Sequence, residues 1–156
     1  MPKRYWLMKS SPTTYSIQDL ERDGQTYWDG VRNYTARNFM RDDMRVDDLV
    51  LFHHSSAKPP GVAGVARICR EAYPDHTAFE KKSKGYDPKS DPEDPRWVMV
   101  DLEHVETFAD VVPMDVLRET KGLDEFPLLM KGQRLSIMRI TRRQFEIVRR
   151  LGRATG

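Results

Sequence analysis

Residues 28–41 read WDGVRNYTARNFMR, and this stretch is the most informative part of the chain. It mixes Trp28 and Tyr34 with two asparagines and three arginines, whereas an ordinary amphipathic helix separates apolar and polar residues by face. Aromatic planes receive bases, asparagine reads base edges and arginine binds phosphate. Aromatic residues are also common in cores and surface plugs, so the stretch alone leaves both interpretations open.

The sequence around this stretch predicts several short helices and strands. Asn33 to Met44 is expected to form a helix with Ala36 and Met40 facing inward. Residues 17–22 are expected to form another, because Ser16 has N-cap spacing and Gly24 provides a stop. Two more helices are predicted, one over residues 113–119 and one after the Thr141 capping box that stops at Gly152. Strands are predicted over residues 5–8, 48–54, 61–70, 97–108 and 133–140.

The order of these elements predicts the fold class. Neighbouring strands form hairpin-like pairs without regular strand–helix–strand alternation, which favours an α+β sheet or a small barrel. Residues 80–95, EKKSKGYDPKSDPEDP, contain three prolines and one glycine and are expected to form a surface excursion. The 156 residues fit one domain, residues 1–156.

The charge of the chain limits what it can bind. Lys and Arg number 26 against 24 Asp and Glu, so the formal net charge is only +2 and any basic surface must be local. Arginine accounts for 17 of the 26 cations, which suits phosphate contacts but is equally consistent with a solvated surface. The longest aliphatic or aromatic run is residues 49–52, so we expect no membrane span. The single cysteine, Cys69, excludes an intramolecular disulfide and is consistent with a cytoplasmic protein.

Catalytic and metal motifs are not apparent in the sequence. The four histidines have no metal-ligand spacing, Cys69 has no histidine partner near it in sequence, and phosphate-binding glycine loops are missing. His53 and His54 are adjacent at a predicted strand end and should point to opposite faces. We therefore expect no metal, no cofactor and no catalytic residues.

Seven segments of the chain resemble the EVE domain family, in register and in order: YWLMKSSP, WDGVRNYTARNFMR, DLVLFHHSS, PPGVAGVARI, REAYPD, YDPKSDPEDPRWVMVDLE and PLLMKGQRLSIM. The resemblance runs from about Tyr5 to Val148. It implies a PUA-like fold, similar to the YTH and ASCH domains, with a strongly bent mixed sheet or small β-barrel surrounded by helices. It also implies binding of a modified base of nucleic acid in an aromatic-lined pocket.

Carried over position by position, the resemblance implies a set of ligand-binding residues. Trp28 and Trp97 are expected to flank the base, while Lys9 and Arg32 hold nearby phosphate. The full set comprises Lys9, Ser10, Trp28, Val31, Arg32, Asn33, Tyr34, His53, Ser55, Trp97, Leu128 and Ser136, with Arg37 and Arg41 expected on phosphate.

Two departures from the family pattern affect this set. Ser11 replaces the acidic residue of the usual KSEP turn, and residues 53–56 read HHSS where the family more often has YHSN. His53 could donate, accept or titrate near neutral pH. It could equally be a partly exposed histidine bonded to a neighbouring carbonyl.

These observations favour a non-enzymatic reader of a flipped, modified base, for example methylated cytosine, in DNA. An RNA or tRNA binder on the same scaffold is the second hypothesis. A nucleic-acid-modifying enzyme is the third, and it would need an acid/base or metal set that the sequence does not supply. The sequence does not indicate an oligomeric state.

Overall fold

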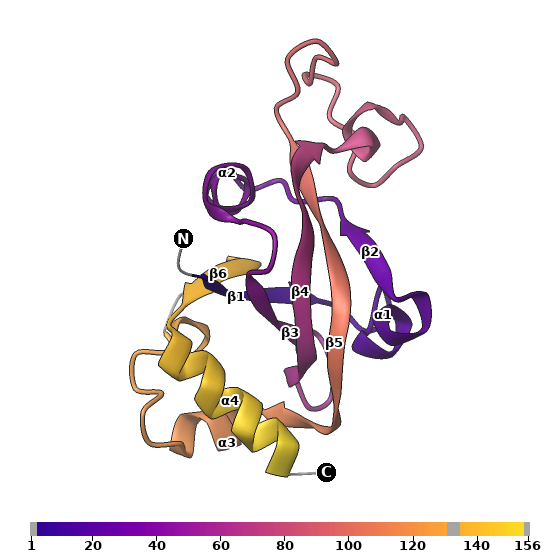
Figure 1. Cartoon of the computed structure of the whole chain (residues 1–156). Coiled ribbons are helices and arrows are strands. Elements are labelled where there is room, and N and C mark those ends of the chain that lie inside the picture. The colour runs from indigo at the N-terminus through magenta and orange to yellow at the C-terminus, as the bar shows by residue number, and fades with distance from the viewer. Residues whose placement is uncertain (1–2, 131–134, 155–156) are drawn as a thin grey trace.

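The computed structural model describes residues 3–130 and 135–154. A six-stranded mixed sheet organises the chain, in the order β2-β5-β4-β3-β1-β6 (Figure 1). The parallel pair β1 and β3 lies near one end of this order, and the other neighbouring strands are antiparallel. The strands are β1 (Tyr5–Ser10), β2 (Gln25–Trp28), β3 (Leu49–His54), β4 (Gly61–Pro74), β5 (Val98–Pro113) and β6 (Ile137–Ile140).

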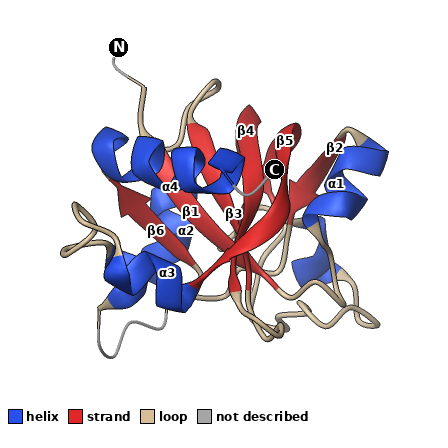
Figure 2. Cartoon of the chain, turned by 90° about the horizontal axis from the view of Figure 1, so that it is seen from below, coloured by secondary structure: helices blue, strands red, loops and turns tan. Residues whose placement is uncertain are grey.

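The sheet is strongly curved (Figure 2). The long pair β4 and β5 shifts register at four places, and such irregularities increase local bend and twist. Within residues 3–130 and 135–154, β2 pairs only with β5 and β6 only with β1, so the sheet stays open. The predicted α+β fold is confirmed, in its bent-sheet form.

Apolar residues cover both faces of the sheet. Trp6 and Met8 of β1 belong to one core cluster, together with Ile17 and Ala36 from the helical segments on that face. Leu7, between them in sequence, faces a second cluster. This alternation follows from the two-residue period of a strand. The second cluster is covered by the C-terminal helices (Figure 2).

The helices are short except for the last. They are α1 (Ile17–Asp23), α2 (Tyr34–Asn38) with a π-helical turn at Phe39–Asp43, α3 (Met114–Glu119) and α4 (Arg142–Ala154), plus 3-10 turns at His76–Phe79 and Pro127–Leu129. The Ser16–Asp19 capping box at α1 and the Thr141–Gln144 pair before α4 are both present, as predicted. None of the described helices has the length and apolarity that a membrane span requires.

Several predicted boundaries were wrong. β2 was not predicted, and β4 and β5 extend several residues beyond their expected ends. Gly152 does not stop α4: a Cβ at this position would lie 2.4 Å from the Phe108 ring, so the glycine allows the helix to approach β5. The last strand begins at Ile137, and the predicted start at residues 133–134 lies outside the described residues. Residues 80–95 form the expected excursion of turns.

Candidate nucleic-acid pocket

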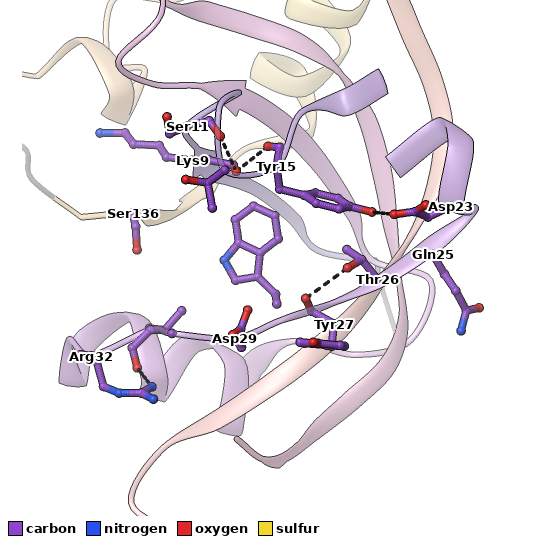
Figure 3. Close-up of a pocket in the computed structure, with 15 residues that line it drawn as sticks. Lys9, Ser11, Tyr15, Asp23, Gln25, Thr26, Tyr27, Asp29, Arg32 and Ser136 are labelled. Atoms are coloured by element: carbon purple, nitrogen blue, oxygen red, sulfur yellow. Dashed lines mark hydrogen bonds between the residues drawn. The ribbon is translucent and has the colours of Figure 1, made fainter. Parts of the chain in front are cut away.

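A hollow of about 740 Å³ lies where β1 ends beside β2, and we call it the β1–β2 pocket (Figure 3). This volume falls in the range of about 300–1,000 Å³ typical of small-molecule sites. Its walls come from the end of β1, the following turn, the last residue of α1, β2, the loop after β2 and one residue before β6. The lining residues are Lys9, Ser10, Ser11, Thr14, Tyr15, Asp23, Gln25, Thr26, Tyr27, Trp28, Asp29, Gly30, Val31, Arg32 and Ser136.

Trp28 is a large aromatic residue of this pocket that packs on the first core cluster, as does Tyr15. It ends β2, where it pairs with Val100 of β5, and it is partly buried. The edge of its ring system meets Phe52, with ring centroids 5.6 Å apart and an interplanar angle of 85°. Phe52 is fully buried, so it fixes the orientation of the indole. The pocket therefore contains a positioned aromatic surface.

The end of β1 and the turn after it form a braced polar wall. The Ser10 hydroxyl donates to the Tyr15 carbonyl at 2.6 Å, and the Tyr15 hydroxyl donates to Asp23 Oδ2 at 2.8 Å. The Lys9 amide donates to the Ser136 carbonyl at 2.9 Å, which joins this wall to the segment before β6. Burial lowers the pKa of Lys9 and, together with the hydrogen bond to Asp23, raises the pKa of Tyr15. Figure 3 shows Lys9 and Ser136 on one side of the pocket and Tyr15 and Asp23 on the other.

The loop after β2 is held by the buried carboxylate of Asp75. This carboxylate accepts from the Gly30 amide at 2.8 Å, from the Thr77 hydroxyl at 2.6 Å and from Arg32 Nη1 at 3.0 Å. Burial alone would raise the pKa of Asp75, but these hydrogen bonds outweigh it and hold the pKa below its usual value. Gly30 has φ +78°, a left-handed conformation that glycine adopts without strain. The backbone of this wall is therefore fixed from behind.

Asp29 is a pocket residue that sequence reasoning missed. Its carboxylate is directed into the pocket in Figure 3. The residue is exposed as a whole, but partial desolvation of the carboxylate and the nearby charge of Asp75 raise its pKa. An ionised carboxylate only accepts hydrogen bonds, so Asp29 favours ligands that present N–H groups.

Comparison with known proteins assigns the chain to a family. The family model described as the EVE domain matches residues 4–151. The chain belongs to the EVE domain family. Mouse thymocyte nuclear protein 1 is 40% identical over 162 aligned positions, which cover 92% of this chain and 71% of the mouse protein.

Solved structures extend this comparison. A Pseudomonas putida protein is 48% identical, with a TM-score of 0.91 and coverage of 95% of this chain and 99% of that one. Human thymocyte nuclear protein 1, in complex with DNA containing 5-methylcytosine, is 40% identical, with a TM-score of 0.88 and coverage of 96% and 98%. The EVE resemblance noted in the sequence is thus confirmed.

Six of the predicted ligand residues line the pocket of this EVE domain. They are Lys9, Ser10, Trp28, Val31, Arg32 and Ser136. Arg32, however, is already engaged: its guanidinium donates to Asp75, to the Thr77 hydroxyl and to the carbonyls of Val31 and Gly85. The structure thus gives Arg32 a bracing role in the wall, and its phosphate contact remains a prediction.

Trp97 lies outside the pocket, in contrast to the predicted pairing with Trp28. It is 5% exposed, its indole Nε1 donates to Asp87 Oδ2 at 2.7 Å, and Tyr34 stacks on it with ring centroids 4.9 Å apart. Arg32 lies over the same indole, 5.5 Å from the ring centroid. The excursion folds back so that Asp87 reaches Trp97, which makes this tryptophan an anchor for the loop.

His53 does not have the environment that the sequence suggested. It is buried rather than partly exposed, and neither ring nitrogen has a hydrogen-bond partner within the described part of the chain. Burial, Lys9 and His54 together lower the pKa of His53 to about 4, so it does not titrate near neutral pH. Its neighbour His54 is structural: His54 Nε2 accepts from the Ile17 amide at 3.0 Å.

The remaining predicted residues also lie outside the pocket lining. Asn33 caps α2 by accepting from the Ala36 amide at 3.0 Å, and Tyr34 is exposed on the outer side of Trp97. Ser55 donates its amide to the Ser10 carbonyl behind the wall, and Leu128 is in the second core cluster.

The two arginines expected on phosphate make contacts within the fold. Arg37 donates to the Arg96 carbonyl at 3.0 Å and lies over the Tyr34 ring, and Arg41 pairs with Asp42 at 2.8 Å. Neither lines the β1–β2 pocket. Their phosphate contacts remain predictions.

Most of the pocket residues missed from the sequence lie on β2 and its flanking turns, and the others lie between β1 and α1 or at the end of α1. The β-favouring Thr26-Tyr27-Trp28 run between Gly24 and the Asp29-Gly30 turn signal could have revealed this strand. Residues 3–130 and 135–154 contain no group of three or more His, Cys, Asp or Glu side chains placed to hold a metal ion.

Proposed function

We propose that this EVE domain is a non-enzymatic reader of DNA that receives a flipped, modified cytosine in the β1–β2 pocket. The observation that carries the proposal is Trp28, an indole fixed by Phe52 inside a pocket of about 740 Å³. The human relative that is 40% identical and crystallised with DNA containing 5-methylcytosine supports the choice of ligand.

The pocket chemistry suits one base taken out of the stack. A base within a duplex hides both faces, so inspection of a modification requires flipping or a single strand. Stacking on Trp28 would contribute about 1–3 kcal/mol whatever the identity of the base. Cytosine presents an N4 amine, and the carboxylate of an acidic residue such as Asp29 can accept a hydrogen bond from it. Lys9 supplies N–H donors for its acceptor atoms, the Ser10 oxygen can still accept a hydrogen bond, and Val31 offers apolar surface to a methyl group.

Ligand recognition explains the polar groups of the pocket, and no catalytic step is needed to explain them. Ser10 and Tyr15 each donate within the wall, to the Tyr15 carbonyl and to Asp23, so their contacts brace the site. A reader needs such fixed groups, whereas an enzyme would need one of them free to attack or to transfer a proton.

Competition binding tests the proposal. A labelled duplex with one 5-methylcytosine is displaced by otherwise identical strands carrying plain cytosine or N6-methyladenine, and by RNA of the same sequence. Burying one methyl group distinguishes methylated from plain cytosine by about 10-fold to 200-fold, so plain DNA should compete at higher concentration. Equal competition by plain cytosine, or stronger competition by RNA, would overturn the assignment.

A further inference from the structure

Helix α4 presents a stripe of arginines to solvent. At 3.6 residues per turn, its five arginines fall within an arc of about 120°. They are Arg142, Arg143, Arg149, Arg150 and Arg153. Glu146 lies within the same arc. Val148 on the opposite side of the helix and Phe145 on its flank are both buried in the second core cluster. Packing of the apolar side therefore orients the arginine stripe outward.

The stripe continues onto the beginning of β1 and the end of β6. Lys3, Arg4, Arg139 and Arg142 line a hollow of about 440 Å³, and none of its lining residues is acidic. A second hollow of about 330 Å³ is lined by Arg149, Arg150, Arg153 and Glu146. We call this surface the α4 basic face, consisting of Lys3, Arg4, Arg139, Arg142, Arg143, Arg149, Arg150 and Arg153.

The α4 basic face holds more positive charge than the chain as a whole. Its eight cations form ion pairs with three carboxylates, those of Asp43, Glu106 and Glu146. The formal charge of the whole chain is +2, so the rest of the protein is net negative. Within the described residues Arg139, Arg143 and Arg150 are exposed and form no ion pair. Such segregation of charge indicates a surface for a polyanion.

The composition and length of the surface match a nucleic-acid backbone. Seven of its eight cations are arginines, whose planar guanidinium groups bind phosphate in a bidentate manner. From Arg142 to Arg153 the stripe is about 16 Å long at 1.5 Å per residue. The axial rise of duplex DNA is about 3.4 Å per base pair, so the stripe matches the length of about five base pairs along the duplex axis.

The α4 basic face is separate from the β1–β2 pocket. The pocket lies at the carboxyl end of β1, whereas Lys3 and Arg4 precede its first residue, about 17 Å away at 3.3 Å per residue. Helices α4 and α1 pack on different core clusters, and Figure 1 shows α4 well apart from α1 and β2. We propose that the α4 basic face is a second nucleic-acid-binding surface, which holds the phosphate backbone of a duplex without reading its sequence. The charge and shape of the α4 basic face indicate a polyanion independently of the pocket. The choice of DNA as that polyanion rests on the proposed function.

The salt dependence of DNA binding tests this inference. Affinity of the full chain for an unmodified 20-base-pair duplex is measured by fluorescence anisotropy between about 50 and 200 mM salt. In the variant R143Q/R150Q we expect the slope of log Kd against log salt to fall by about 1 for each lost phosphate contact. The matched control K81Q/K82Q removes the same charge from exposed residues of the excursion and should keep the slope.

The outcomes distinguish this inference from the proposed function. If R143Q/R150Q binds with unchanged slope and affinity, the α4 basic face does not contact DNA and the inference is overturned. If the unaltered chain shows no preference for 5-methylcytosine, the reader proposal fails, while the slope on plain duplex still decides the role of α4. A fall in slope with retained preference for the modified base supports both. Circular dichroism confirms that each variant is folded.

Discussion

Replacement of Trp28 or Trp97 by alanine should produce different phenotypes, because Trp28 lines the pocket and Trp97 anchors a loop. Trp97 is 5% exposed, stacked on Tyr34 and hydrogen-bonded to Asp87. Its replacement by alanine should cost about 3–5 kcal/mol of unfolding free energy. For a chain of this size that lowers the unfolding temperature by about 6–20 °C. Affinity of the fraction that stays folded should change little.

Trp28→Ala should instead reduce binding. Loss of the stacking surface removes about 1–3 kcal/mol, or about 5-fold to 150-fold in affinity for the flipped base. Because Trp28 is only partly buried, the loss of stability should be smaller than for Trp97. Trp28→Phe, which keeps an aromatic plane, should restore part of the affinity.

Thermal unfolding and competition binding, measured on the same samples, compare the two effects. Tyr86→Ala is the control, since Tyr86 is an exposed aromatic residue outside the pocket. A Trp97→Ala protein with unchanged unfolding temperature and abolished base binding would show that Trp97 touches the ligand. A Trp28→Ala protein with unaltered affinity would refute the stacking role.

Three further substitutions have expected outcomes. Because the pKa of Asp29 is raised in the folded state, its ionised carboxylate destabilises the fold above that pKa. Asp29→Asn should therefore raise the unfolding temperature at pH 7, and this gain should vanish near pH 3. The same variant should bind cytosine less tightly. The lowered pKa of His53, about 4 against about 6.5 when unfolded, means that stability falls as pH drops from 6.5 to 4; His53→Phe should flatten this part of the profile of unfolding free energy. Gly152→Ala places a Cβ 2.4 Å from the Phe108 ring, and chemical denaturation should show a loss of about 1–3 kcal/mol, although alanine is the better helix former.

Local signals predicted the elements that depend on local contacts. The capping residues Ser16 and Thr141 start their helices as expected, since each cap bonds an amide three residues away. Strand β2 was missed because it is four residues long, at a sheet edge, and only partly buried. Its existence depends on pairing with β5, more than seventy residues further along the chain.

The predicted site residues also divide into those that the structure places in the pocket and those that the wider fold places elsewhere. Trp28 and Ser10 lie in the pocket, whereas Trp97 lies outside it and donates a hydrogen bond to Asp87. Composition does not reveal this contact. The sequence left open whether His53 titrates near neutral pH or bonds a neighbouring carbonyl. Burial keeps it neutral, and its ring nitrogens have no hydrogen-bond partner among the described residues. Depth of burial is set by the whole fold, so a residue's type alone does not predict its protonation.

The Asp75 carboxylate has a consequence for the speed of recognition. It ties Gly30 and Arg32 to the segment after β4, so the loop beside Trp28 is already ordered in the free protein. A preorganised wall loses little conformational entropy when a ligand enters. We therefore expect extrusion of the base from its duplex to be the slow step of capture. Association should accelerate when the target base sits opposite a mismatch, because a mismatched base leaves the stack more easily.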